Sequence, residues 1–409
     1  MHNKKILIIG DDIRQATGVA NILRPVSLFL SRHYDIVQMA AGLEKDKEED
    51  ISDTIQKITE NDNAYFKIYG TDGYGSIERL SEIIEKESCD CLFLMTDPHR
   101  FEWILGSYRS SVQCPIFYYH VWDNKPYPFF LKSFYENCET ISCISKLTEE
   151  CVKNVVPDHK SVYYTPHGVD TTMFFPQQSE LIKKNREAFL GRNYKFVLFF
   201  NGTNIARKEI SNTIISFEKF YRKLKKKEKE DVVLLMHTNP EASRGINLNK
   251  ILDDLYPELP VLISNEVVSE KVLNNMYNLS HCTINISSNE GFGLCTLESV
   301  ATKTPIIVNK TGGLIDQINT KWTYAIEPHC KVLKGTQKTP YIYSDYTDPN
   351  VVSKKILDVY KANDIQMDEF LEFIDAQNFK TETMCNDIAK QIKKTISDWE
   401  NLQDQSLTT

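Results

Sequence analysis

The chain has 409 residues, of which 41% are hydrophobic and 25% are charged, and its formal net charge is −8. Two domains are expected, because this length exceeds that of a single typical hydrophobic core. The acidic balance argues against nucleic acid as a partner, and no run of about 18 apolar residues predicts a transmembrane helix.

The first half of the chain alternates short apolar runs with helical stretches. Residues 6–9 predict a buried first strand, because this apolar run is too short for the core of a signal peptide. A polar segment at 44–62 interrupts the rhythm and is expected to be a helix or an insertion. The other elements predicted here are a helix at 19–31 and strands at 34–39, 91–95, 115–119 and 139–144. Such alternation is typical of parallel βαβ units in a doubly wound sheet.

A second alternating set follows a linker. The linker begins after a strand at 161–164 with the turn His167-Gly168-Val169-Asp170, and it ends in a polar helix that reaches Arg192. Strands are then predicted at 195–200, 232–236, 261–263, 282–286 and 305–309. The expected architecture is therefore two open α/β sheets, in which ligands bind at the carboxyl ends of the strands.

The ten cysteines show no Cys-x-x-Cys pair, and most lie in apolar segments. This pattern is typical of free thiols in a reducing compartment, so we expect a cytoplasmic protein without a zinc site. Four Asn-x-Ser/Thr sequons fall in predicted strands or candidate site loops, where glycans would be hard to accommodate.

A polar loop with two cations follows the predicted strand that ends at Phe200. It begins with Asn201 and Gly202 and ends with Arg207 and Lys208. Two adjacent cations after a buried strand would offset the charge of a diphosphate and stabilise it as a leaving group. The alternative interpretation is a solvated helix start.

The most informative stretch is 288–298, which reads Ser-Asn-Glu-Gly-Phe-Gly-Leu-Cys-Thr-Leu-Glu. A strand, a glycine turn and a helix in this order make a cradle for an anion, because glycine admits a close backbone approach and the first N–H groups of the helix face the ligand. Glu290 and Glu298 flank this turn, and both carboxylates can accept hydrogen bonds from hydroxyls. A sugar nucleotide fits this arrangement, because it has hydroxyl groups on both sides of its diphosphate. The alternative is an ordinary βαβ unit with exposed acids on its helix.

The wider stretch adds a Pro-led strand at 305–308 and the pair Gly312-Gly313. Together with residues 290–298, it resembles the donor-binding signature of family 4 retaining glycosyltransferases. The resemblance implies the α/β GT-B fold, in which two doubly wound Rossmann-like domains face each other across a deep cleft. It implies three parts, which are an N-terminal acceptor domain at 1–176, a nucleotide-sugar donor domain at 177–376 and a C-terminal helix at 377–409 that crosses back to the first domain.

The resemblance also implies roles for the residues of the turn. Glu290 is expected to contact hydroxyls of the donor sugar, and Glu298 is expected to hold the ribose. Backbone groups near Phe292, Gly293 and Leu294 are expected to meet the phosphates.

Two further loops take roles from the same resemblance. Asn201 and Gly202 are expected in the donor site, with Arg207 and Lys208 neutralising the leaving diphosphate. Gly18 is expected to approach the donor phosphates from the first domain, although a plain turn before a helix is the alternative.

The first domain holds one expected catalytic residue and two acceptor-side candidates. The catalytic candidate is His120, which the resemblance places in the cleft near the transferred sugar, although a packed histidine is the alternative. Asp123 is expected to orient His120 or to contact the acceptor, and His99 is an acceptor-side candidate by its position. The acceptor itself is expected to be a glycan, a lipid-linked sugar or a protein, with at most peripheral membrane contact.

The expected reaction is glycosyl transfer from a UDP- or GDP-sugar to an acceptor hydroxyl with retention of anomeric configuration. No cofactor is expected. No Asp-x-Asp occurs in the chain, so the usual ligand pair of a metal-bridged diphosphate is missing and no metal is expected. Two rival functions remain: a sugar-nucleotide epimerase or phosphorylase of the same architecture, and a non-catalytic sugar-nucleotide-binding or scaffold protein.

Overall fold

The computed structural model describes residues 3–104, 114–159, 161–362 and 365–407. These residues form two compact units. Unit 1 comprises Met1–Gly168, Gly335–Tyr341 and Thr381–Thr409, and unit 2 comprises Val169–Lys334 and Ile342–Lys380. The chain passes between the units at 168/169, 334/335, 341/342 and 380/381. The domain boundaries expected from the sequence were 176/177 and 376/377.

Unit 1 is built on an eight-stranded sheet in the order β3-β4-β2-β1-β5-β6-β7-β8. Its strands are β1 (Lys5–Asp11), β2 (Asp35–Ala41), β3 (Glu48–Asp50), β4 (Phe66–Thr71), β5 (Cys91–Leu94), β6 (Ile116–His120), β7 (Thr140–Cys143) and β8 (Val162–Tyr164). All neighbours pair in parallel except β3, which is antiparallel to β4. Residues 6–9 of β1 and 91–94 of β5 are apolar and fully buried, as is typical of a parallel sheet covered on both faces.

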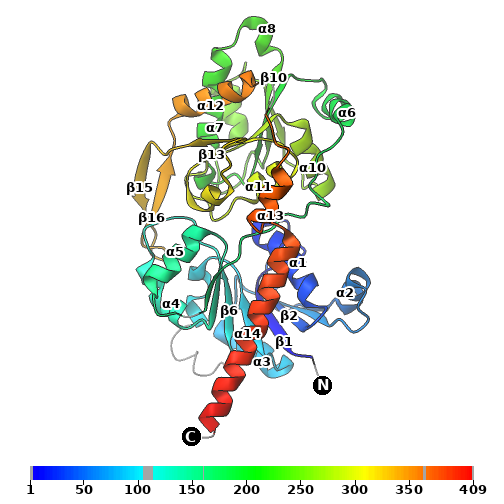
Figure 1. Cartoon of the computed structure of the whole chain (residues 1–409), viewed down its shortest axis with the longest axis vertical. Coiled ribbons are helices and arrows are strands. Elements are labelled where there is room, and N and C mark those ends of the chain that lie inside the picture. The colour runs from blue at the N-terminus through cyan, green and yellow to red at the C-terminus, as the bar shows by residue number, and fades with distance from the viewer. Residues whose placement is uncertain (1–2, 105–113, 160, 363–364, 408–409) are drawn as a thin grey trace. The chain divides into compact units, whose positions relative to one another are not determined.

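The helices of unit 1 are α1 (Gly18–Leu30), α2 (Ser52–Thr59), α3 (Ile77–Glu87), α4 (Lys132–Glu136), α5 (Lys146–Val155) and α14 (Thr381–Leu407), with short 3₁₀ turns η1 (Pro98–Arg100), η2 (Glu102–Ile104) and η4 (Phe129–Leu131). Thr17, Ser76 and Ser145 start α1, α3 and α5 as side-chain N-caps. The long helix α14 belongs to this unit and packs against α1, β6 and β7 (Figure 1).

Unit 2 contains a six-stranded parallel sheet in the order β11-β10-β9-β12-β13-β14, together with an antiparallel hairpin of β15 and β16. The strands are β9 (Phe196–Asn201), β10 (Val232–His237), β11 (Val261–Ser264), β12 (Cys282–Asn285), β13 (Ile306–Asn309), β14 (Thr323–Ile326), β15 (Cys330–Lys334) and β16 (Ile342–Tyr346). The strand order reverses between β9 and β12, which is where such sheets place their ligands.

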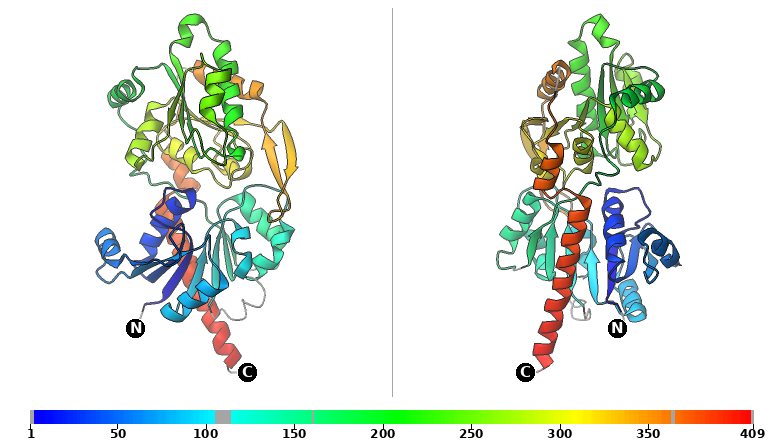
Figure 2. Two further views of the ribbon diagram at one scale, coloured as in Figure 1. Left: turned by 180° about the vertical axis from the view of Figure 1, so that it is seen from behind. Right: turned by 45° about the vertical axis from the view of Figure 1, so that its right-hand side comes forward.

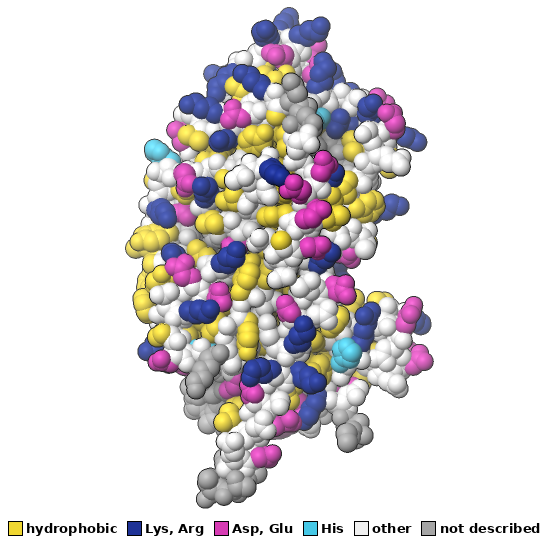
Figure 3. Space-filling view, viewed as in Figure 1, with side chains coloured by type: hydrophobic (Ala, Val, Ile, Leu, Met, Phe, Trp, Pro, Cys, Tyr) yellow, Lys and Arg dark blue, Asp and Glu magenta, His cyan; other side chains and the backbone are white. Residues whose placement is uncertain are grey.

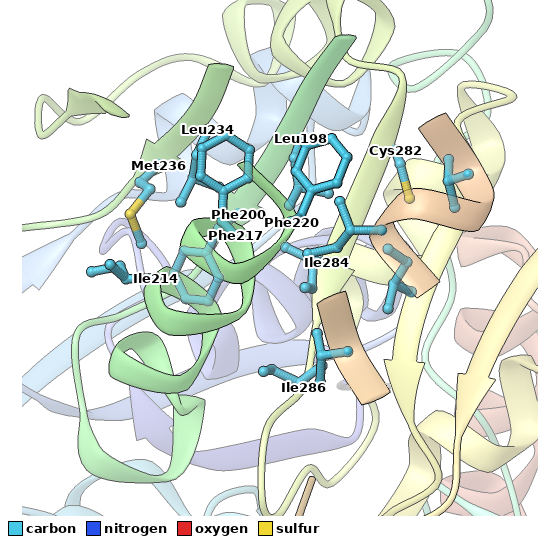
Figure 4. Packing of buried hydrophobic residues seen from close by; sticks show 14 of the residues in the cluster. Leu198, Phe200, Ile214, Phe217, Phe220, Leu234, Met236, Cys282, Ile284 and Ile286 are labelled. Carbon is cyan, nitrogen blue, oxygen red and sulfur yellow. The ribbon is translucent and has the colours of Figure 1, made fainter. Parts of the chain in front are cut away.

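The remaining helices are α6 (Ser179–Leu190), α7 (Ile210–Arg222), α8 (Lys226–Lys229), α9 (Leu248–Leu255), α10 (Glu270–Leu279), α11 (Leu294–Ala301), α12 (Pro349–Lys361) and α13 (Phe370–Ala376), with η5 (Ala206–Lys208) and η6 (Gly312–Gln317). Helices α7 and α12 lie together on one side of the sheet, and α10 and α11 lie on the other (Figures 1 and 2). Apolar side chains of β9, β10, β12 and α7 interlock in the core of this unit, as Figure 4 shows for Phe200, Phe217, Leu234 and Ile284. This packing fixes the carboxyl ends of β9 and β12.

Charged side chains of both signs are spread over the face in Figure 3, and the basic run at 222–229 forms the exposed end of α7 and the short helix α8. No helix in the described ranges is long and apolar enough to cross a membrane.

Candidate functional site

The turn between β12 and α11 has a backbone conformation that only glycine adopts easily. Gly293 has a φ of +93° and directly precedes the first residue of α11. A Cβ at this position would also lie 2.5 Å from Cδ2 of Leu314. Glycine is therefore required here by both torsion angle and space. The turn aims the first N–H groups of α11, which lack acceptors within their own helix, at the space beside the loop.

Residues of η6, including the Gly312-Gly313 pair, stabilise this turn through hydrogen bonds and close packing. The N–H of Gly313 donates to the carbonyl of Glu290 at 2.9 Å, and a Cβ on Gly313 would come within 2.1 Å of the carbonyl oxygen of Gly291. Gln317 donates through Nε2 to the carbonyls of Phe292 (2.7 Å) and Gly293 (3.1 Å). The turn is therefore a rigid, hydrogen-bonded structure.

Glu290 forms a buried ion cluster with two cations from η5. Its Oε2 accepts a charge-assisted hydrogen bond from Lys208, and its Oε1 lies 3.3 Å from Nη1 of Arg207. Ser287 donates to the same carboxylate at 3.2 Å. Burial opposes ionisation of Glu290, but the charges of Lys208 and Arg207 overcome it and lower its pKa to about 2. The loops after β9 and β12 thus meet at one point.

Backbone bonds fix the two loops to each other. The N–H of Ser288 donates to the carbonyl of Arg207 at 2.8 Å, and Nη1 of Arg207 donates to the carbonyl of Asn289 at 3.0 Å. Gly202, at the end of β9, has the side chain of Lys208 next to it. The cations are consequently positioned by the fold and not only by their attraction to Glu290.

Glu298 lies one turn into α11 and faces a different environment. Its Oε2 accepts a hydrogen bond from the hydroxyl of Tyr277 at 2.6 Å, and that hydroxyl accepts one from Nδ2 of Asn201 at 2.9 Å. Burial raises the pKa of Glu298 to about 7, although the bond from Tyr277 acts in the opposite direction. The structure therefore brings Asn201 and Glu298 together through a tyrosine from α10.

Two of the expected residues in unit 1 lie in different surroundings. His120 is fully buried at the end of β6, its Nε2 lies 2.7 Å from the hydroxyl of Tyr135, and burial lowers its pKa to about 3. This favours the packed histidine over one that lines a ligand surface. Gly18 is the first residue of α1, and a Cβ there would meet nothing within 4 Å. Local packing therefore does not demand a glycine at this position.

The acceptor-side candidates are both partly exposed. His99 lies in η1 after β5, and burial together with the charge of Arg100 lowers its pKa. Asp123 follows β6. Each therefore lies at or beyond the carboxyl end of a strand of unit 1.

Sequence reasoning missed residues that hold the site from other elements. Tyr277 joins Asn201 to Glu298, and Gln317 anchors the turn. The sequence around these two residues does not predict a role in the site. Tyr277 occupies a position typical of the apolar face of a helix, and Gln317 is indistinguishable from a surface amide. Among the residues that the structure describes, no group of three or more His, Cys, Asp or Glu side chains is arranged to hold a metal ion.

Solved structures share the arrangement of both sheets. Sucrose-phosphate synthase from Thermosynechococcus elongatus matches with a TM-score of 0.73 and 13% identity, over 97% of this chain and 100% of that one. Anabaena HepE, solved in complex with UDP and glucose, matches with a TM-score of 0.66 and 13% identity, over 96% and 100%. These likenesses confirm the predicted GT-B fold with its two Rossmann-like sheets.

Sequence comparison gives weaker and partial matches to curated proteins. A probable sucrose-phosphate synthase of Thermosipho melanesiensis is 22% identical over 231 residues, which cover 55% of this chain. The match covers 50% of that relative, so the chain spans about half of its length.

The family comparison covers the linker, most of unit 2 and the candidate donor residues of that unit, but not Gly18, His99, His120 or Asp123. The family described as "Family 4 Glycosyltransferase in conflict systems" matches residues 147–365, which is more than half of the 409 residues. The chain therefore belongs to the family 4 glycosyltransferases, in the branch described from conflict systems.

Proposed function

We propose that this protein transfers a sugar from a nucleotide-diphosphate sugar to an acceptor hydroxyl, with the donor bound at the turn between β12 and α11. The observation that carries the proposal is the convergence of Glu290, Arg207 and Lys208 beside the start of α11. A diphosphate needs donors and positive charge, and a sugar needs carboxylates that accept from its hydroxyls. The site supplies both within two adjacent loops.

The two glutamates bind different parts of the donor. The ionised Glu290 accepts hydrogen bonds from hydroxyls of the transferred sugar, and its low pKa keeps it ionised throughout the neutral range. Glu298 accepts from the ribose, with Tyr277 orienting its carboxylate. The N–H groups at Gly293 and Leu294 bind the diphosphate, and Phe292 is held in place by Gln317.

Departure of the diphosphate is assisted by the two cations. As the glycosidic bond breaks, negative charge grows on the leaving phosphate, and Lys208 and Arg207 can shift their interaction from Glu290 toward that charge. Preorganised charges in a partly buried site stabilise such a transition state strongly. This supports transfer without a metal ion. Family membership supports retention of configuration.

The proposal also covers the nucleotide of the donor, the acceptor and the location of the protein. UDP is proposed as the nucleotide part of the donor, because HepE was solved in complexes that contain UDP and UDP-glucose. His99 and Asp123, which are partly exposed, are proposed to contact the acceptor. The cysteines form no disulfide, which supports a reducing, cytoplasmic location.

The proposal is tested by incubating the protein with UDP-glucose or GDP-mannose in EDTA and a panel of acceptor glycans. Release of UDP or GDP, followed by proton NMR of the anomeric signal in the product, measures turnover and stereochemistry. Acceptor-dependent release with a retained anomer supports the proposal. Tight nucleotide-sugar binding with no release in any condition would favour a non-catalytic binding protein.

A further inference from the structure

Unit 2 contains a second cavity, far along its strands from the candidate donor site. Its lining includes the first residues of β9, β12 and β13 or those just before them, whereas the donor loops follow the opposite ends of β9 and β12. Its volume is about 410 Å³, within the range of small-molecule sites. Lys208, Glu290 and Glu298 are not part of its lining. The two sites are therefore separate.

The described lining of this cavity carries cations but no carboxylate. Arg186, Lys195 and Lys303 line it, together with His281, and no Asp or Glu is found among its described lining residues. Lys195 and Lys303 pair with carboxylates outside the lining, at the solvent-exposed rim. Ion pairs of this exposed kind contribute little energy and exchange partners easily. The described lining residues therefore favour a negatively charged ligand.

Arg186 is the feature that makes this a built site. It extends from α6, exposes only 9% of its surface and has no carboxylate partner within the described structure. Its Nε donates to the carbonyl of Leu279 at 2.8 Å and its Nη1 donates to Asn193 at 3.1 Å. No described group accepts a bond from Nη2. Burying an arginine without a carboxylate is costly, and an anion in the cavity would offset that cost.

His281 provides a second donor next to Arg186. The backbone N–H of Val197 donates to Nδ1 of His281 at 2.9 Å, so the proton of the neutral ring is on Nε2. Nε2 has no acceptor among the residues of the described ranges. Burial and the nearby charge of Arg186 keep this ring neutral by lowering its pKa. Among the described residues, Nη2 of Arg186 and Nε2 of the partly buried His281 thus have no hydrogen-bond acceptor.

The rest of the lining is apolar or neutral. Its apolar residues include Ile182, Pro305, Val359, Tyr360 and Ile365. A bare inorganic anion would leave this surface uncovered, whereas an anion on a ring-sized apolar or sugar body would cover it. A phosphate monoester carries up to two charges and several acceptor oxygens, which matches several convergent donors better than a carboxylate does.

We propose that this cavity binds a small phosphate monoester, with Arg186 and Lys303 holding the phosphate. The ligand would contact α10 through Asn278, which lines the cavity. The neighbouring Tyr277 bonds Glu298 of the donor site. The cavity is therefore connected to the donor site through one helix.

The test is isothermal titration calorimetry of the full chain with phenyl phosphate, benzoate, benzyl alcohol and inorganic phosphate. Phenyl phosphate is expected to bind at one site more tightly than the other three probes. Lys303→Glu is expected to weaken this binding by at least about tenfold, which is about 1.4 kcal/mol. Lys321→Glu is the matched control, because Lys321 also forms an exposed ion pair nearby but does not line the cavity.

Two further variants separate the cavity from the donor site and from a folding defect. Arg186→Gln is expected to weaken phenyl phosphate binding, and its fold is checked by circular dichroism; if it does not fold, Lys303→Glu alone decides. Lys208→Ala is expected to leave the binding unchanged. Loss of binding in Lys208→Ala but not in Lys303→Glu would overturn the proposal, as would benzyl alcohol or benzoate binding as tightly as phenyl phosphate.

Discussion

Glu290 and Glu298 are the same side chain in two opposite electrostatic environments. Glu290 lies against Lys208 and Arg207, which hold its pKa at about 2. Glu298 is partly buried beside Tyr277, and desolvation raises its pKa to about 7. One carboxyl is therefore permanently charged at neutral pH, and the other titrates there. This difference gives the proposed donor site a pH dependence of its own.

Donor affinity is expected to fall as the pH decreases from 8 to 6. The ionised Glu298 can accept hydrogen bonds at both carboxylate oxygens, whereas protonation turns one of these oxygens into a hydroxyl. Glu298→Gln keeps the bond from Tyr277 but cannot titrate, so its affinity should be lower and constant across this range. Calorimetric titration of UDP-glucose at several pH values measures both, because a diphosphate esterified at both ends has no terminal phosphate that titrates in this range. A wild-type affinity that does not change between pH 8 and 6 would contradict this role of Glu298.

Removal of the lysine charge tests the leaving-group role. Lys208→Met is expected to reduce the rate of UDP release in the transfer assay by about 10²–10³-fold, as for other preorganised electrostatic groups. Lys310→Met is the control, because Lys310 forms an exposed ion pair with Glu327 away from the turn. If both variants keep wild-type rates, Lys208 does not act on the leaving group.

At the scale of elements, the turn between β12 and α11 depends on contacts made by η6. The glycine pattern at 291–293 and the acids were readable from the sequence because they lie within one short segment. The contributions of Tyr277 and Gln317 were not readable, because they reach the site from α10 and η6 through tertiary packing. Likewise β4 and the hairpin of β15 and β16 were missed. In β15 every residue is exposed, so it has no apolar alternation to detect.

Gly293→Ala tests the rigidity of the turn. We expect it to lower the free energy of unfolding of unit 2 by about 1–3 kcal/mol, because it adds a strained backbone and a clash with Leu314. Gly191→Ala is a matched control, since Gly191 also has a positive φ (+75°) but open space around its Cβ. Chemical denaturation measures both. Equal effects of the two substitutions would show that the contact with Leu314 is unimportant.

At the scale of the whole molecule, the resemblance in one segment led to the correct fold class for the complete chain. The predicted α/β architecture with two parallel sheets is confirmed. Glu290 lies in the turn before α11, and Glu298 lies in α11 itself. His120 is the last residue of β6, and its role beside the transferred sugar stays a prediction. The sequence could not show that Tyr135 and Tyr118 pack against it. Burial of one side chain depends on the packing of distant segments.

Three buried histidines predict how stability depends on pH. Burial lowers the pKa values of His120, His167 and His281 from 6.5 to about 3, so the unfolded chain takes up protons first as the pH falls below 6.5. Glu298 acts in the opposite direction between 7 and 4.5, but it is one group against three. The melting temperature is therefore expected to fall between pH 6.5 and 4.5.

Differential scanning calorimetry across this range measures the effect. His167→Gln should reduce the slope of melting temperature against pH, whereas substitution of the exposed His33 by Gln should leave it unchanged. A melting temperature that rises from pH 6.5 to 4.5 would mean that these histidines are not buried in the neutral form.

Calorimetric titration of UDP-glucose and GDP-mannose in EDTA tests whether a nucleotide sugar binds at the turn between β12 and α11. Wild-type protein is expected to bind one of them at a single site, and Glu298→Ala is expected to lose that binding while keeping its fold. Absence of binding by both sugar nucleotides and by free UDP and GDP, or binding that Glu298→Ala leaves intact, would mean that this turn is not a donor site.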